Sequence, residues 1–460
     1  MSINFSAFEI GRRALNANQF GISITGQNIA NINTPGYSRR RAQLAEADTA
    51  NIAGTSIGQG VKVTGIEAFR DNLIQSRIQT ETGISGKLSA YRDSLSPVET
   101  ALNSSESGGL QNAISSFFGA FRDLDANPNS LSLRAVATQR GTNMAGSFQS
   151  TRAKLDFIRT DVDGQLRSAV DQVNTLSQHI AKLNTNIKGI ESSGGDASSL
   201  RDQQTELINQ ISDLAGVRKT QNADGSVNLT IGEGRPLVTG DRAFELQAVN
   251  TPPLGFATLT LEGQPATIEE GKIRGFQDAI DEISSQIDTL DNLAASVVDR
   301  INTLHASGTD LDGNAGGKFF SDTPAVTAAN ISLDPIVKAN PRLVVASALA
   351  QPGQNGTIAG EIANLMTDPT STVGSQTGSF SSIYGSMLSE MGEKLNAAEN
   401  NLQTQTAIIA QATAQRDSIS GVSLDEEAIN LLQYQKAFEA AARFIKVADE
   451  MTQTILSLAQ

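Results

Sequence analysis

The sequence predicts a mainly α-helical fold with a β insertion, in which long heptad-patterned helices include a coiled-coil-like pair formed by the two chain ends. Three observations lead to this prediction. Apolar residues alternate at spacings of three and four along several long segments, which is the pattern of a helix packed along another helix. Both chain ends carry such a stripe. Residues 217–271 change to the period of two that is typical of strands, so we expect a small antiparallel β domain there.

The N-terminal segment predicts a helix with two distinct apolar faces. One face has an apolar residue at every seventh position: Phe8, Leu15, Ile22 and Ile29. Beside it lies a stripe with several small residues: Ile10, Ala14, Ala17, Gly21 and Ile24. Because small residues leave little bulk, another backbone can approach this second stripe closely.

The middle of the chain predicts further long helices, separated by recognisable breaks. Seams run over residues 84–102, 162–190, 200–214, 276–304 and 384–412, of which 162–190 and 276–304 are unbroken and 384–412 has one polar lapse. The glycine-rich break at 192–199 predicts a helix–helix loop. At the C-terminus a last seam includes Leu431, Phe438, Ile445 and Ile455. We expect the two terminal helices to pack on each other or on neighbouring copies of the chain, because isolated amphipathic helices are marginal in water.

The non-helical segments complete the predicted organisation. Residues 34–65 predict one edge hairpin, and residues 306–380 a loop-rich region with many prolines. We expect residues 1–65 with 416–460 to form a terminal helical polymerisation domain and residues 66–215 with 272–415 a long-helix middle domain. The β-rich insertion then covers residues 216–271.

Composition excludes several kinds of chemistry. The 460 residues include 35 Lys and Arg against 49 Asp and Glu, a formal net charge of −14, so we expect no binding to nucleic acid or to an anionic membrane. No Cys and 2 His exclude disulfides, cysteine nucleophiles and zinc sites built from thiolates or imidazoles. The sequence has neither a long apolar run nor the start of a signal peptide. We expect no cofactor, and a structural or binding protein in preference to an enzyme.

Three local patterns suggest other functions. Gly54 to Gly58 matches the G-x-S-x-G pattern around Ser56, but a serine hydrolase needs a strand before the serine and a helix after it. Asp310, Asp312 and Asn314 resemble half of a calcium loop, but Ala315 stands where that loop needs Gly, and a polar turn explains the run more simply. The basic triplet Arg39–Arg41 is best interpreted as a solvated or intersubunit charged face. We expect no catalytic or metal site.

Two terminal motifs resemble a known family. Asn28, Asn31, Thr34, Pro35, Gly36 and Tyr37 lie in the segment NIANINTPGYS, which resembles the N-terminal signature of bacterial flagellar rod, hook and hook-associated proteins. Pro35 disfavours helical geometry at the residue before it, Gly36 permits a tight turn, and the Asn side chains can cap backbone groups where the helix ends.

The C-terminal motif SGVSLDEE, from Ser420 to Glu427, resembles the signature of the hook-associated proteins of the hook–filament junction, the FlgK family. Within it, Ser423 is placed to cap a helix whose first turn carries acids, including Glu426. The long internal helix that runs into ASGTDLDGNAGGKFF is also typical of this family, whose longer members carry an additional β domain after that segment.

The resemblance implies a function and partners. A member of this family is expected to be a structural adaptor that polymerises into a short ring joining hook to filament. Its partners would be other copies of itself, the hook protein, a second junction protein on the filament side, and a flagellar export chaperone at the C-terminal helix. It would be secreted through the flagellar type III export apparatus to the extracellular flagellum. The alternatives are a flagellar hook or rod subunit, or a secreted serine hydrolase that uses Ser56.

Overall fold

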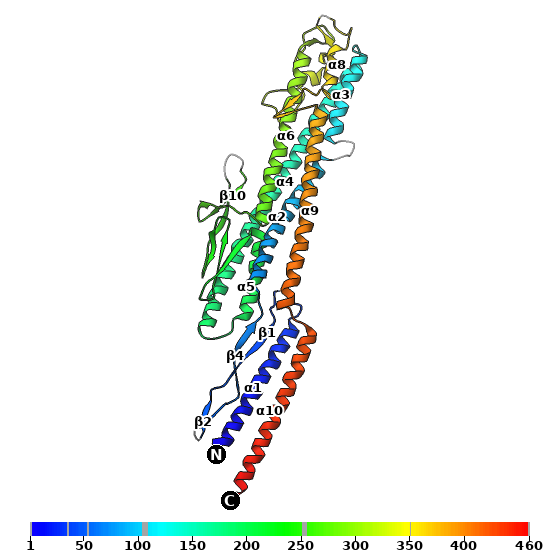
Figure 1. The fold of residues 1–460 in the computed structure, drawn as a ribbon. Helices are drawn as coiled ribbons and strands as arrows, with labels where there is room; N and C mark the ends of the chain where they lie inside the picture. Colours follow the sequence, from blue (N-terminus) through cyan, green and yellow to red (C-terminus); the bar gives the residue numbers. More distant parts are fainter. Residues whose placement is uncertain are drawn as a thin grey trace.

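A computed structural model describes residues 2–34, 36–52, 55–103, 109–250, 255–349 and 351–458. The molecule is a long rod of helices, and both chain ends lie at the same end of it (Figure 1). The mainly α fold with a small β portion and paired terminal helices is confirmed. Among the described residues, no helix is long and apolar enough to span a membrane.

The terminal helices form a pair that projects from one end of the rod. Helix α1 (Ser2–Ala30) lies beside α10 (Leu424–Leu458) (Figure 1). Strand β1 (Arg40–Glu46) pairs antiparallel with β4 (Val61–Ala68), and β2 (Ala50–Ile52) with β3 (Thr55–Ile57). The hairpin expected at residues 34–65 is therefore two successive ladders and extends to Ala68. Gly60 packs against Ile10 of α1.

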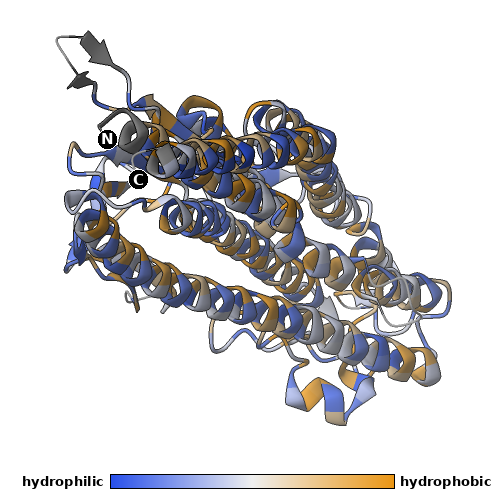
Figure 2. Cartoon of the chain, turned by 90° about the horizontal axis from the view of Figure 1, so that it is seen from below, coloured by the Kyte–Doolittle hydropathy of each residue, from blue (hydrophilic) through white to orange (hydrophobic). Residues whose placement is uncertain are grey.

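The rod is built from long helices whose heptad seams face one another. Its main helices are α2 (Asn72–Leu102), α4 (Leu131–Ser192), α5 (Ser198–Ala215), α6 (Lys272–Ala306) and α9 (Phe380–Ser420). The predicted loop at 192–199 is confirmed, and seam residues such as Val162, Ile180 and Leu290 are buried. In the view along the rod, hydrophobic and hydrophilic residues alternate along these helices, as expected for helices with one buried face (Figure 2).

The tip of the rod, far from the terminal pair, is more ordered than a loop-rich region suggests. Helix α3 (Leu110–Ala126), which the sequence analysis did not identify, packs there with α8 (Thr357–Asn364). Around them lie α7 (Pro335–Ala339), η1 (Pro341–Leu343), β12 (Gly308–Thr309), β13 (Ser347–Ala348), β14 (Thr372–Val373) and β15 (Gln376–Thr377). Phe117 packs in the core against Phe319 and Phe320 with tilted rings, whose centroids lie 5.7 and 5.8 Å from that of Phe117.

The β insertion lies against α4, as two small antiparallel sheets. One has the strand order β5-β6-β7-β8 and the other β11-β10-β9. The strands are β5 (Val217–Gln221), β6 (Val227–Ile231), β7 (Arg235–Thr239), β8 (Arg242–Ala243), β9 (Leu246–Asn250), β10 (Ala257–Leu261) and β11 (Gln264–Pro265). Asn184 of α4 binds the first sheet through both main-chain groups of Val227. The strands predicted around Val227 and Leu259 are confirmed.

Candidate functional site

The most elaborate polar site of the described chain lies where the terminal pair meets the rod. We call it the joint and define it by Asn28, Tyr37, Arg39, Arg40, Arg70, Asp202 and Glu427. Helix α1 ends within the joint, at Ala30. There Asn31 Nδ2 donates to Gln27 O at 2.9 Å, and Thr34 Oγ1 donates to Asn31 Oδ1 at 3.2 Å.

The turn after α1 folds as its motif suggests. Gly36 has φ +78°, the left-handed region that glycine adopts without strain. Asn31 binds a carbonyl of the last helical turn, which is the capping role expected of the Asn side chains. Pro35 lies outside the described residues. The local chemistry of this motif therefore ends α1 and turns the chain back towards the rod.

Asn28 is the centre of the joint. Its Nδ2 donates to Arg40 O at 2.9 Å and to Glu427 Oε2 at 3.0 Å. Its Oδ1 accepts from Tyr37 Oη at 2.8 Å and from Arg40 N at 3.1 Å. The side chain is 1% exposed, so these bonds replace all of its contact with water. Burial raises the pKa of the Tyr37 phenol, which keeps its hydroxyl protonated and able to donate.

Glu427 brings α10 into the same network. It lies in the first turn of α10 and is 2% exposed. Arg39 Nε donates to Glu427 Oε1 at 2.8 Å, and Arg39 Nη1 donates to Glu426 Oε2 at 2.6 Å. The acids of the first turn, which the sequence analysis assigned to the helix dipole, therefore also bind the segment that follows α1.

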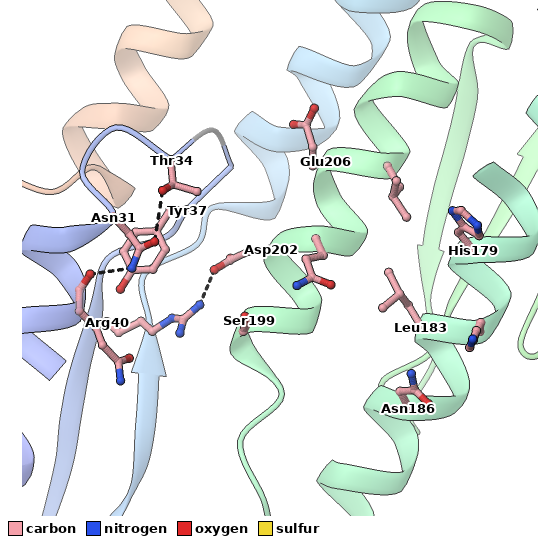
Figure 3. Close-up of a pocket in the computed structure, with 14 residues that line it drawn as sticks. Asn31, Thr34, Tyr37, Arg40, His179, Leu183, Asn186, Ser199, Asp202 and Glu206 are labelled. Atoms are coloured by element: carbon pink, nitrogen blue, oxygen red, sulfur yellow. Dashed lines mark hydrogen bonds and ion pairs between the residues drawn. The ribbon is translucent and has the colours of Figure 1, made fainter. Parts of the chain in front are cut away.

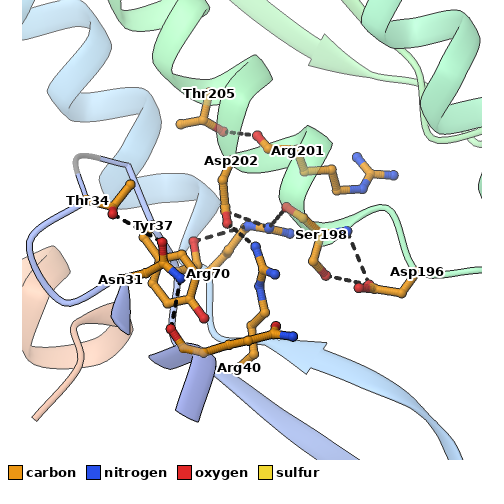
Figure 4. A network of polar contacts seen from close by, with 12 residues as sticks. Asn31, Thr34, Tyr37, Arg40, Arg70, Asp196, Ser198, Arg201, Asp202 and Thr205 are labelled. Carbon is orange, nitrogen blue, oxygen red and sulfur yellow. Dashed lines mark hydrogen bonds and ion pairs between the residues drawn. The ribbon is translucent and has the colours of Figure 1, made fainter. Parts of the chain in front are cut away.

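Asp202 of α5 ties this network to the rod. It accepts from Arg40 Nη2 at 2.6 Å and from Arg70 Nη2 at 2.7 Å (Figure 4). The Arg40 guanidinium also lies over the Tyr37 ring, 4.8 Å from its centroid. Arg70 further donates to Ser198 O at 2.8 Å, near the start of α5. The network thus connects four parts of the chain: residues 28–40, Arg70, Asp202 of α5 and Glu427 of α10.

The joint corrects one interpretation of the sequence. Arg39 and Arg40 do not form a solvated or intersubunit face, because acids distant in the sequence bind them within the chain. Only Arg41 fits that description, since it pairs with Glu67 on the surface. Arg70 and Asp202 carry no sequence signal for this role, because the pairing depends on long-range packing.

A pocket of about 760 Å³ lies between the chain reversal after α1 and the α4–α5 hairpin (Figure 3). Asn31, Tyr37 and Arg40 line one side of it. The other side carries His179 and Leu183 of α4 and residues of α5. No cluster of three or more metal-ligating side chains occurs in the part of the chain that the structure describes.

The terminal pair has a close contact and an open face. A Cβ built on Gly21 would lie 2.6 Å from the Tyr434 ring, and one built on Gly11 would lie 2.4 Å from Ile445. The helices therefore approach at glycines, as the stripe that includes Gly21 predicts. Apart from the residues at this contact, α10 exposes a large set of apolar side chains: Ile429, Leu432, Phe438, Val447, Met451 and Ile455.

The residues predicted to pack between subunits divide into two groups. Phe438 and Ile455 are exposed on α10. The others are half-buried within the chain: Phe8, Leu15, Ile22, Ile29, Leu431 and Ile445. Ile445 contacts Gly11 of its own chain. Contact of these residues with neighbouring copies stays a prediction.

The features that suggested a hydrolase do not come together. Ser56 lies in β3, within a hairpin and not at a strand-to-helix turn, and its side chain lies outside the described residues. His305 ends α6 towards the opposite end of the rod, where Nδ1 lies 2.7 Å from Gly317 O and Nε2 accepts from Val345 N at 2.9 Å. Burial lowers the pKa of His305 to about 4. This histidine is a buried, neutral structural residue.

The half calcium loop is a polar turn, as expected. Asp310 Oδ1 accepts from Asp312 N at 2.9 Å and from Asn314 N at 2.8 Å. Asp312 points instead to Arg342, with which it forms an ion pair. The Asp310 carboxylate is thus used by backbone groups of its own turn.

Comparisons with known proteins agree with the terminal motifs and the long helices. The protein-family model described as "Flagellar hook-associated protein FlgK helical domain" matches residues 95–320. "Flagella basal body rod protein" matches residues 8–37, and "Flagellar basal body rod FlgEFG protein C-terminal" matches residues 414–458. The two family models of flagellar rod proteins thus cover α1 with the turn that follows it, and α10.

Curated relatives match over almost their whole length. Flagellar hook-associated protein 1 of Bacillus subtilis is 26% identical, covering 99% of both chains. The protein of the same name from Escherichia coli is 23% identical, covering 96% of this chain and 98% of its own. The solved structure of the flagellar hook junction protein FlgK from Burkholderia pseudomallei superposes with a TM-score of 0.66 at 16% identity, over 75% of this chain and 100% of that one. This likeness shows a shared fold.

Proposed function

Because the chain belongs to the FlgK family of flagellar hook-associated proteins, we propose that it is a structural adaptor that polymerises into a short ring between the hook and the filament. Its mechanism is packing and not turnover. The terminal pair is the polymerising part, and the rod stands outside it. The joint fixes the angle between the two.

The observation that carries this proposal is the open apolar face of α10. Val447, Met451 and Ile455 are each more than half exposed although they follow helical spacing along one side of the helix. Burying an apolar side chain contributes about 1.5–3 kcal/mol, so a stripe of this length can hold a neighbouring subunit. Such a stripe on an isolated chain is a typical mark of a protein–protein contact.

The partners follow from the family and remain part of the proposal. They are further copies of the chain, the hook protein, a second junction protein on the filament side, and an export chaperone that covers α10 before assembly. The protein would reach the extracellular flagellum through the flagellar type III export apparatus. Phe8, Leu15, Ile22, Ile29, Leu431, Phe438, Ile445 and Ile455 are proposed as packing residues, of which Ile445 also serves the pair within one chain.

The test places charge on the open face of α10. Val447→Asp with Met451→Asp should leave the monomer folded, because both side chains lie in solvent, yet abolish filament attachment in a deletion strain. Gln435→Asp with Gln453→Asp is the matched control, since it adds the same charge at exposed polar positions of the same helix. Circular dichroism checks folding, and electron microscopy checks attachment. Normal filaments in the first variant would contradict the proposal.

The second candidate is a hook or rod subunit, which the two matched rod models favour. The strain that lacks the gene distinguishes the two. An adaptor at the junction predicts complete hooks with flagellin lost to the medium. A hook or rod subunit predicts that the hook or rod itself is absent.

A further inference from the structure

The two halves of α9 are held by the rod in different ways. The upper half lies in the main hydrophobic core, where its buried apolar residues are Phe380, Ile383, Tyr384, Met387 and Met391. Tyr384 Oη also donates to Leu102 O at 2.7 Å, and Lys394 Nζ donates to Glu282 Oε2 of α6 at 2.7 Å. The upper half is therefore fixed to the tip and to α6.

The lower half, residues 396–420, makes a much thinner contact, and we call it the arm. The residues that it buries are Ala398, Gln405, Ala412 and Ser420. Ala412 packs with Ile74 and Ile78 of α2 in a small apolar cluster that is separate from the main core. Figure 1 draws the arm, in orange, along one edge of the rod. It therefore rests on α2 mainly through small side chains and one amide.

Polar contacts between the arm and α2 are few. Gln405 Nε2 donates to Glu81 O at 3.0 Å and to Glu81 Oε2 at 2.5 Å. Arg92 Nη1 donates to Glu399 Oε2 at 2.9 Å, but that carboxylate is 44% exposed, and surface pairs of this kind contribute little to stability. Residues 400–415 carry no charge, so no ion pair holds the arm over this length. Gln405 is thus the main polar latch between the arm and α2.

Helix α2 itself is firmly placed. A Cβ built on Gly86 of α2 would overlap the Asp213 carbonyl of α5. One built on Gly275 of α6 would overlap the Lys87 carbonyl of α2. Both neighbours therefore approach α2 at backbone distance, and a shift of α2 would disrupt close packing on two sides. Motion between α2 and the arm consequently belongs to the arm.

A glycine marks the border between the two halves of α9. Gly392 lies in the helix interior, directly after the buried Met391. A Cβ built on Gly392 would meet no atom within 4 Å, so packing does not require a glycine there. Because Gly weakens a helix interior relative to Ala, α9 bends easily at this position. Gly385 has equally open surroundings, but it lies between the core residues Tyr384 and Met387, where both sides are held.

The far end of the arm is bound to the joint. Arg39 N donates to Ser420 O at 2.9 Å. Helix α10 begins at Leu424, after the short link 421–423, and Arg39 also binds Glu427 in its first turn. The arm and α10 are therefore coupled, because moving one displaces the start of the other.

We propose that the arm swings away from α2 about Gly392 and carries the start of α10 with it, while the tip and the rest of the rod stay closed. Gly392 is the hinge, and Gln405 and the joint are the latches. Ala412 lies about 30 Å along the helix from the hinge, so a bend of about 10° moves it by about 5 Å. The inference goes beyond the proposed ring. It gives the single chain a closed state, in which the joint fixes the angle of the terminal pair, and an open state in which the pair is free to turn.

Thiol labelling of the purified full-length chain measures this opening, because the chain has no Cys of its own. Ala412→Cys places a thiol between the arm and α2, where the native side chain is 2% exposed. Ala294→Cys places one in the main core on α6, where the native side chain is 0% exposed. The arm thiol should react at least about tenfold faster than the core thiol, because only the arm opens locally. Equal rates would overturn the proposal.

The hinge has a matched control. In the Ala412→Cys chain, Gly392→Ala should slow labelling about two- to fivefold, which is the equivalent of about 0.5–1 kcal/mol, the amount by which Ala stabilises a helix interior over Gly. Gly385→Ala, in the anchored half, should leave the rate unchanged. An equal effect of the two substitutions would show that α9 does not bend at Gly392.

The latch is tested in the same chain. Gln405→Ala should speed labelling several-fold because it removes the bonds to Glu81, whereas Gln411→Ala, at an exposed position of the arm, should not. Circular dichroism checks that each variant is folded. An unchanged rate without Gln405 would overturn its role as a latch. All these rates are measured on the monomer, so they stand or fall independently of the ring, which the α10 variants test.

Discussion

The rod and the terminal pair carry the same heptad pattern but satisfy it differently. In the rod, Phe148, Leu155 and Leu290 are fully buried by other helices of the same chain. In α10, Met451 is 57% exposed and lies in a comparable seam. The heptad seams of the rod are therefore covered within one molecule, whereas the terminal pair has apolar surface left for a partner. A heptad repeat predicts that a helix will be covered, but not by which chain.

The largest expected effect is a loss of free energy of unfolding that differs between the rod and the terminal pair. Phe148→Ala should lower the free energy of unfolding by about 3–5 kcal/mol, because it opens a cavity in the rod. Met451→Ser should change it by less than about 0.5 kcal/mol, because that side chain is already in solvent. Guanidinium unfolding of the purified monomer measures both. Equal losses would mean that α10 is covered within the monomer, contrary to the comparison.

The second expected effect is a loss of stability at low pH that arises from His305 in the rod. Burial lowers the pKa of His305 from 6.5 to about 4. Between these values the unfolded chain binds a proton that the folded chain does not. Stability is therefore complete above pH 6.5 and falls as the pH drops towards 4, by about 3 kcal/mol in all. Unfolding curves from pH 7 to 4 measure the slope.

The control for the pH effect is the other histidine. His179 is exposed, so His179→Gln removes an imidazole from the surface and serves as the comparison variant. His305→Gln should reduce the pH dependence of the free energy of unfolding, even if this variant is less stable than the unmodified protein at pH 7. A slope that persists without His305 would assign the acid sensitivity to other groups.

The smallest expected effect concerns the joint that connects the two regions. Glu427→Ala removes a buried acceptor from Asn28 and Arg39 and should cost about 2 kcal/mol, less than for a fully buried pair because Arg39 is partly in solvent. Hydrogen exchange should show faster exchange in α1 and α10 and unchanged exchange in the rod. Arg41→Ala, which breaks only a surface pair, is the control. Unchanged exchange in α1 would show that the joint does not hold the pair.

The sequence predicts the helices well where apolar spacing is continuous. The seams over 162–190 and 276–304, the 192–199 loop and the pairing of the termini are all recovered. Helix α3 was missed, although its buried Ile114, Phe117, Phe121 and Leu124 follow helical spacing. The order of the tip was also missed, because Phe319 and Phe320 find their aromatic partners only in three dimensions.

The joint could be predicted only in part. Asn28, Asn31 and Gly36 are visible in the terminal motif because their roles are local to the end of α1. The partners of the arginines are not visible, since Asp202 lies 162 residues from Arg40. No periodicity or spacing links two such residues, and only the packing of α5 beside the chain reversal brings them together.

The bond between Asn28 and Glu427 joins residues 399 positions apart. It cannot close until all the residues from Asn28 to Glu427 have been synthesised. A chain that stopped before α10 would leave Asn28 and Arg39 without the Glu427 carboxylate, and α1 without the helix it packs on. The contact thus forms late: α1 can be held at the joint only after the first turn of α10 exists.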